Sequence, residues 1–150
     1  MLATGSKAPA FTLLDDQVNQ TSLADMLRAG PLILYFYPAD FTPGCTREAC
    51  SIRDMHDDLA ATGLRVLGVS PQSTESHRRF RAKFKLPFAL LSDPDKTVTR
   101  AYDCDGPFGF GVRRASYLVK PPGVIAAAVL ADFQISRHEA FFRQAINLTE

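Results

Sequence analysis

Two continuous apolar runs most constrain what this chain can fold into. The first, Leu32–Tyr37, has a proline on either side, and the second, Leu64–Ser70, begins after a glycine and ends before a proline. Such runs are typical of strands that are buried on both faces. The segment between them has apolar residues at the spacing of one helix face, at Ala49, Ile52, Met55 and Leu59. A strand, a helix and a strand within about 40 residues predict a βαβ unit whose two strands are parallel neighbours.

The alternation of helix and strand patterns continues to the end of the chain. It predicts helices over 73–84 and 96–102, strands over 88–91, 116–119 and 124–129, and a final helix that starts at a capping box over 136–139. In that final helix, Phe141, Ala145 and Leu148 are expected to face inward. The last two strands flank a Pro-Pro-Gly turn and should form a hairpin. The chain is therefore expected to be an α/β protein with a mixed β-sheet, helices on both faces and a thioredoxin-like architecture.

Composition narrows the class of protein further. A chain of 150 residues is expected to form one domain, residues 1–150. The 17 basic and 16 acidic side chains nearly cancel, which argues against a nucleic-acid partner. No stretch approaches the roughly 18 apolar residues of a membrane span, and the first residues lack the apolar core of a signal peptide. We therefore expect a cytoplasmic protein, in which three cysteines do not make a disulfide framework.

The segment that follows the first buried strand carries the reactive residue types. Cys45 should fall in the first turn of the next helix, where free backbone N–H groups and the helix dipole stabilise an anion. A thiol placed there loses its proton more readily, and the thiolate is the nucleophile. Thr42 offers a hydroxyl to the sulfur or to an incoming oxygen. Pro38 fixes the chain where the strand ends and can shield the sulfur from water.

These residues match a known family. The pattern Pro38-x-x-x-Thr42-x-x-Cys45 is similar to the active site of the peroxiredoxins. Residues 42–50 resemble the peroxiredoxin Q, or bacterioferritin comigratory protein, subfamily, and segments 90–93 and 114–119 follow in the expected order. The resemblance extends from about Gly5 to Phe133. The loop over 103–111 differs from the tryptophan-containing loop usual in the subfamily, and we expect it to border the site.

The resemblance implies a thiol-dependent peroxidase that reduces hydrogen peroxide and organic hydroperoxides. Cys45 would be the peroxidatic cysteine, which attacks the peroxide and becomes a sulfenic acid. Thr42, the backbone N–H of Cys45, Pro38 and Arg114 would form the peroxide site. Cys50 would be the resolving cysteine and would close a disulfide with Cys45. A thioredoxin or glutaredoxin would then reduce that disulfide, and no metal, haem or flavin is implied.

Several interpretations stay open at this point. Glu48 is either a residue that positions Arg114 or an ordinary surface glutamate. Cys104 matches no motif and is either a bystander or a second resolving cysteine. The three histidines show no metal-ligand spacing with the cysteines, which argues against a zinc site. The alternatives to a peroxidase are a thioredoxin-like dithiol–disulfide exchanger, which would favour Cys-x-x-Cys, and a redox sensor. A monomer is expected, because no apolar stripe is left over beyond the core.

Overall fold

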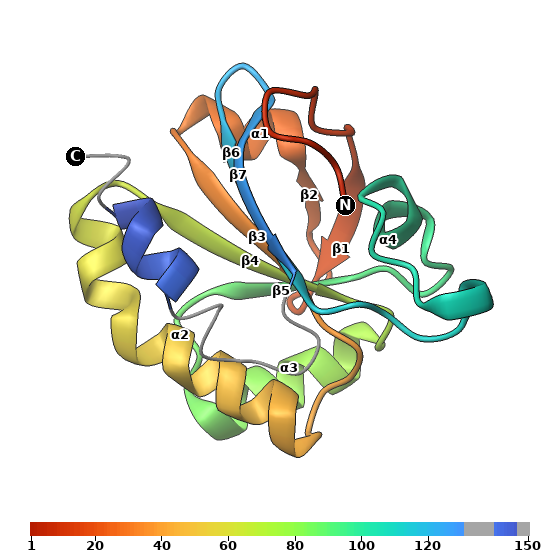
Figure 1. The fold of residues 1–150 in the computed structure, drawn as a ribbon. Helices are drawn as coiled ribbons and strands as arrows, with labels where there is room; N and C mark the ends of the chain where they lie inside the picture. Colours follow the sequence, from red (N-terminus) through yellow and green to blue (C-terminus); the bar gives the residue numbers. More distant parts are fainter. Residues whose placement is uncertain (131–139, 147–150) are drawn as a thin grey trace.

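The computed structural model describes residues 1–130 and 140–146, and its core is a mixed β-sheet (Figure 1). The strands are β1 (Thr12–Asp15), β2 (Gln20–Ser22), β3 (Leu32–Phe36), β4 (Arg65–Ser70), β5 (Ala89–Ser92), β6 (Ala115–Lys120) and β7 (Val124–Leu130). The helices are α1 (Leu23–Arg28), α2 (Pro43–Ala61), α3 (Thr74–Phe84) and α4 (Thr97–Ala101), with a 3₁₀ turn over Pro107–Gly109. Residues 140–146 are also helical.

The order of the strands in the sheet is β2-β1-β5-β4-β3-β6-β7. β3 pairs with β4, and β4 with β5, in parallel, which confirms the predicted βαβ unit. β6 runs antiparallel to β3 and forms the predicted hairpin with β7. The sheet is therefore mixed, as the sequence indicated, and β3 lies inside it with a strand bonded to each side.

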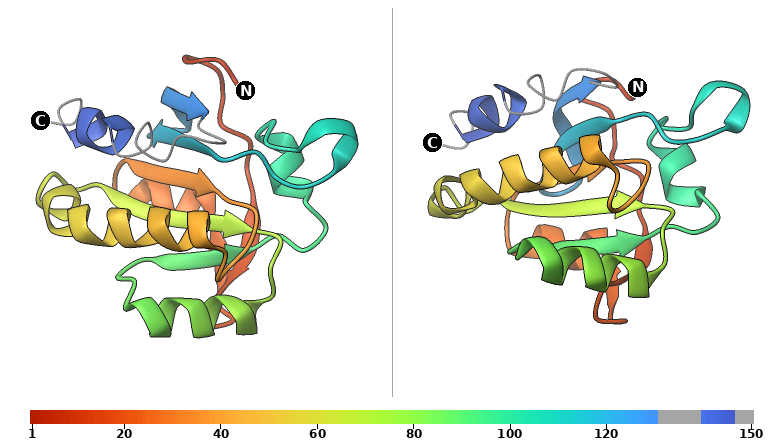
Figure 2. Two further views of the ribbon diagram at one scale, coloured as in Figure 1. Left: turned by 60° about the horizontal axis from the view of Figure 1, so that its bottom comes forward. Right: turned by 90° about the horizontal axis from the view of Figure 1, so that it is seen from below.

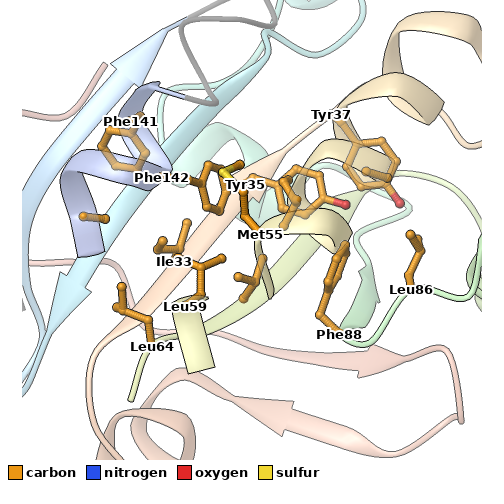
Figure 3. Packing of buried hydrophobic residues seen from close by; sticks show 14 of the residues in the cluster. Ile33, Tyr35, Tyr37, Met55, Leu59, Leu64, Leu86, Phe88, Phe141 and Phe142 are labelled. Carbon is orange, nitrogen blue, oxygen red and sulfur yellow. The ribbon is translucent and has the colours of Figure 1, made fainter. Parts of the chain in front are cut away.

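Helices cover both faces of the sheet, which confirms the predicted thioredoxin-like α/β architecture. Viewed from below in Figure 2, α2 and α3 lie in front of the strands. Side chains alternate along β3, so Ile33, Tyr35 and Tyr37 pack under α2, α3 and the helical residues 140–146 (Figure 3). On the other face, Leu32, Leu34 and Phe36 pack with α1, α4 and the N-terminal segment.

The sequence analysis missed the elements of the first 30 residues, β1, β2 and α1. They are only four, three and six residues long, and β1 shows half-buried alternation over just four positions. Patterns this short are not distinct from a loop in a single sequence. Partners elsewhere in the chain hold them in place, since β1 pairs antiparallel with β5 and Leu23 and Leu27 of α1 are buried.

The predicted final helix is described only in part. Phe141 and Ala145 are buried, as expected, at 5% and 1% exposure. The predicted capping box over 136–139 and Leu148 lie outside the described residues. Among the residues that are described, no helix is long and apolar enough to cross a membrane.

Gly68 lies in the middle of β4, and the side chains of Tyr35 on β3 and Leu90 on β5 occupy the space where its side chain would be. A Cβ atom at this position would lie 2.8 Å from Leu90 Cδ2 and 2.8 Å from Tyr35 Cζ. We expect Gly68→Ala to lower the free energy of unfolding by about 1–3 kcal/mol, because overpacking of a dense core forces neighbouring side chains to shift. Urea unfolding followed by circular dichroism measures this, and an unchanged unfolding curve would contradict it.

Candidate functional site

The candidate site lies where β3 ends and α2 begins. Thr42 is the N-cap of α2, Pro43 is its first residue and Cys45 its third. The N–H groups of the first turn have no carbonyl within the helix to bind, so those of Gly44 and Cys45 are available to an anion. The Cys45 side chain is buried, at 1% exposure, beneath this first turn. The predicted placement of Cys45 at the start of a helix is therefore confirmed.

Strand pairing brings a cation to the sulfur. Because β6 runs antiparallel to β3, with Ala115 opposite Phe36, Arg114 emerges beside the carboxyl end of β3. Its Nη2 lies 3.3 Å from Cys45 Sγ, and its Nη1 lies 2.8 Å from Glu48 Oε1. Arg114 thus bridges a thiol and a carboxylate that lie one helical turn apart on α2.

The charges of this group of three residues support one another. Burial alone would lower the pKa of Arg114, but the Glu48 carboxylate and the Cys45 sulfur beside it raise that pKa above its ordinary value. The guanidinium is therefore permanently charged. Glu48 is buried, at 1% exposure, so the interpretation as a surface glutamate is wrong. Its carboxylate forms an ion pair with Arg114 in a largely dry environment.

Thr42 makes a different hydrogen bond from the one expected. Its hydroxyl donates to the carbonyl of Ala39, at 3.1 Å, and not to the Cys45 sulfur. A hydroxyl has one hydrogen but two lone pairs, so Thr42 Oγ1 remains able to accept a hydrogen bond. Pro38 is half-buried and lies four residues before Thr42, toward β3.

A cavity of about 550 Å³ opens beside the sulfur site. It shares Pro38 and Arg114 with that site, and its other walls come from residues 105–107 and 110–113. The loop over 103–111 therefore borders the site, as predicted. Phe110, which lines the cavity, is 79% exposed, and Phe108 of the same loop is 98% exposed, so this loop presents apolar side chains to solvent.

The other two cysteines differ sharply in environment. Cys50 is half-buried on α2, while Cys104 is fully buried near Tyr102 and Tyr117. Burial raises the pKa of Cys104 to about 12, so its thiol is neutral at physiological pH. All three cysteines are free thiols in this structure. No group of three histidine, cysteine or acidic side chains among the described residues could hold a metal ion.

One polar network near the site was not predicted. The side chains of Asp40, in the loop before α2, and His77, on α3, are both fully buried, and they meet at 2.7 Å. The sequence did place His77 on the same side of its helix as Phe80 and Phe84, which is a signal for a buried histidine. It carried no signal for the partner, because the two residues are far apart in the chain.

Comparison with known proteins identifies the family. The model of the AhpC/TSA family matches residues 4–128, and the chain belongs to this family. A bcp-type peroxiredoxin of Coxiella burnetii is 45% identical over 132 residues, which are 84% of this chain and 87% of that protein. The chloroplastic peroxiredoxin Q of Sedum lineare is 39% identical over 135 residues, which are 89% of this chain and 72% of that protein.

Solved structures give the same result. Peroxiredoxin Q of Xanthomonas campestris superimposes with a TM-score of 0.85 at 30% identity, over 93% of this chain and 92% of that one. The peroxidoxin BcpB of Mycobacterium tuberculosis has a TM-score of 0.92 at 26% identity, over 100% of this chain and 99% of that one. The chain is thus a thiol-dependent peroxidase of the peroxiredoxin Q type, as the motifs predicted, and the alternative of a dithiol–disulfide exchanger or sensor is not favoured.

We expect Arg114→Ala to slow alkylation of Cys45 by iodoacetamide at pH 7 by about tenfold, because a guanidinium beside the sulfur favours the thiolate. The rate is measured in a Cys50→Ser, Cys104→Ser background whose folding is checked by circular dichroism. Arg47→Ala is the matched control, since Arg47 is an exposed cation two residues from Cys45. Equal rates for the two variants would contradict a direct effect of Arg114.

Cys104 should resist modification in the native protein. Its thiol, with a pKa of about 12, carries almost no thiolate between pH 7 and pH 9, and burial excludes the reagent. Iodoacetamide at pH 8 followed by mass spectrometry should modify Cys104 only after denaturation. Modification of Cys104 in the native protein, at a rate similar to that of Cys50, would show that its pocket opens.

Proposed function

We propose that this chain reduces hydroperoxides at Cys45, with Arg114 and Thr42 binding the substrate. The observation that carries the proposal is the 3.3 Å contact between Arg114 Nη2 and Cys45 Sγ at the start of α2. The Cys45 thiolate attacks the terminal oxygen of ROOH. A sulfur–oxygen bond forms, the O–O bond breaks, and the alkoxide RO⁻ leaves and takes a proton. The products are Cys45 sulfenic acid and an alcohol, or water when the substrate is hydrogen peroxide.

Each neighbour of the sulfur has a role in this step. The guanidinium of Arg114 faces the reacting atoms and stabilises the negative charge as it passes from sulfur to the departing oxygen. The N–H of Cys45 and its helix end provide further positive potential. The Thr42 hydroxyl, which already donates to Ala39, can accept the hydrogen of the peroxide O–H group. Glu48 holds the Arg114 fork in one orientation through its 2.8 Å contact.

Resolution by Cys50 requires α2 to change shape. Five residues along an α-helix separate the two Cα atoms by about 8.5 Å, whereas a disulfide needs about 7 Å or less. The first turns of α2 must therefore unwind before the Cys50 thiol attacks the sulfenic sulfur and water leaves. A thioredoxin or glutaredoxin then reduces the Cys45–Cys50 disulfide. The cysteine spacing and the half-buried position of Cys50 support this assignment.

The central experiment follows peroxide consumption with a thiol reductant and the products by mass spectrometry. Cys45→Ser should abolish turnover, because no other described cysteine contacts a cation at a helix start, whereas Cys104→Ser should keep most activity. One equivalent of hydrogen peroxide should give an intrachain Cys45–Cys50 bond, together with faster amide exchange over residues 49–55. Normal turnover by Cys45→Ser would overturn the site. If no Cys45–Cys50 disulfide forms, Cys50 takes no part in the cycle and the protein is a one-cysteine peroxidase.

The cavity beside Arg114 supports organic hydroperoxides as substrates. Its volume of about 550 Å³ far exceeds what hydrogen peroxide needs and lies within the range of small-molecule sites, roughly 300–1,000 Å³. Pro38, Pro107, Phe110 and Val112 give it an apolar lining. A substrate whose peroxide group is held by Arg114 can thus place its organic group in this cavity.

We expect Phe110→Ala to slow oxidation of Cys45 by cumene hydroperoxide about three- to tenfold, because loss of an aromatic contact to the organic group of the substrate costs about 1 kcal/mol. Oxidation by hydrogen peroxide, which does not reach Phe110, should be unchanged. The two rates are measured by single-turnover kinetics on the same preparation. An equal loss for both substrates would contradict a binding role for the cavity.

The remaining parts of the proposal concern the protein as a whole. One domain, residues 1–150, is proposed to carry the complete reaction as a monomer in the cytoplasm, where thiols are kept reduced. No cofactor enters the scheme, because each electron pair moves between sulfur and oxygen or between two sulfurs.

A further inference from the structure

We propose that Asp40, held by His77, is a positioning residue that orients the Thr42 hydroxyl for peroxide binding. The inference rests on the proposed function, in which Thr42 contacts the substrate. Asp40 lies in the loop between β3, a central strand of the sheet, and α2, the helix that contains Cys45. Neither residue touches the reacting atoms in this scheme.

The Asp40 carboxylate is held from two elements. Tyr37 directly follows β3, and its hydroxyl donates to Oδ1 of Asp40 at 2.7 Å. Burial raises the pKa of Tyr37 well above its ordinary value, so this hydroxyl is always a donor. From α3, the Ser76 hydroxyl donates to Oδ2 at 2.7 Å, and His77 Nδ1 lies 2.7 Å from the same oxygen. A buried carboxylate with this set of partners has one position.

His77 is itself fixed by the sheet. Its Nε2 lies 3.0 Å from the carbonyl of Leu91, which can only accept, so Nε2 carries a hydrogen. The Nδ1 atom then faces Oδ2 of Asp40 at 2.7 Å. The imidazole side chain is completely buried. His77 thereby connects the loop before α2 to β5 through a rigid aromatic ring.

The loop passes this restraint to Thr42. The carbonyl that accepts the Thr42 hydroxyl belongs to Ala39, the residue directly before Asp40. Phe41, directly after Asp40, has a φ of 65°, a conformation that costs energy in a residue with a side chain. Its ring packs edge-on against Phe80 of α3, with centroids 5.2 Å apart. Docking of Asp40 and Phe41 on α3 holds the strained turn and so directs the Ala39 carbonyl at Thr42.

A double-mutant cycle tests the inference. Asp40→Ala should slow oxidation of Cys45 by hydrogen peroxide about tenfold or more, because a misplaced contact to substrate costs this much. Alkylation of Cys45 by iodoacetamide needs a thiolate but no Thr42 contact, so its rate should change less than about twofold. In a Thr42→Val background, Asp40→Ala should slow the peroxide reaction no further. Thr42→Val removes no helix cap, since this hydroxyl makes no capping bond.

Conservative and control variants separate geometry from stability. Asp40→Asn keeps an acceptor for Tyr37 and puts an NH2 group in place of Oδ2, with one hydrogen for His77 Nδ1 and one for the Ser76 hydroxyl, which then accepts. It should therefore restore the peroxide rate to within about threefold of the original. If Asp40→Ala does not fold, Ser76→Ala replaces it in the test, because this variant removes only one hydrogen bond to the Asp40 carboxylate. It should slow the peroxide reaction and leave the alkylation rate unchanged. Thr99→Val is its matched control, because the Thr99 hydroxyl makes an equal 2.7 Å bond to buried Asp93, away from this loop. It should leave both rates unchanged.

The outcomes are distinguishable. If Cys45 of the original protein does not react with peroxide, the proposed function fails. If it reacts, but Asp40→Ala has the same effect with and without the Thr42 hydroxyl, or slows alkylation and peroxide reduction equally, the positioning role is overturned. An Asp40→Asn variant as slow as Asp40→Ala would also overturn it, because charge and not geometry would then be responsible.

Discussion

The pairing of β3 with β4 on one side and β6 on the other is the constraint on which the site depends. The parallel partner requires a crossover, and that crossover is α2, whose first turn contains Cys45. The antiparallel partner begins where β3 ends, so Arg114 arrives at the same edge. Two residues that are 69 positions apart thereby meet at 3.3 Å. The geometry of the sulfur site is thus a consequence of strand direction, more than of any property of the loop alone.

Cys45 and Cys104 show that burial does not define a reactive cysteine. Both thiols are buried, at 1% and 0% exposure. Cys104 donates to the Tyr102 carbonyl and has a pKa raised to about 12, because burial penalises its charged form. Cys45 instead lies beneath a helix start and accepts from a guanidinium. A fixed positive environment, itself balanced by the Glu48 carboxylate, is what separates a nucleophile from a structural thiol.

Local patterns predicted the parts of the molecule that such patterns encode. The sequence predicted β3 from its continuous apolar run, α2 from its helical spacing, and the position of Cys45 from the motif around it. The resemblance to the family also identified Arg114, far along the chain. The meeting of Asp40 with His77 was not, since it depends on how α3 docks against the loop. The burial of Glu48 was likewise undecided, because glutamate is mostly exposed in proteins and its partner Arg114 is distant in the sequence. Short β1 and β2 gave too few residues for a period to be recognised.

The proposed cycle places two opposing demands on the start of α2. Cys45 needs the folded first turn to act as a nucleophile, and it needs that turn to open before Cys50 can reach it. The helix start suits both demands, because it has no side-chain cap and no acidic residue in its first turn. A capping bond would add about 1 kcal/mol to the cost of opening, and a carboxylate there would repel the thiolate. The loop before it is held by Asp40 and Phe41 on α3, so unwinding can begin at the helix and leave the peroxide-binding turn in place.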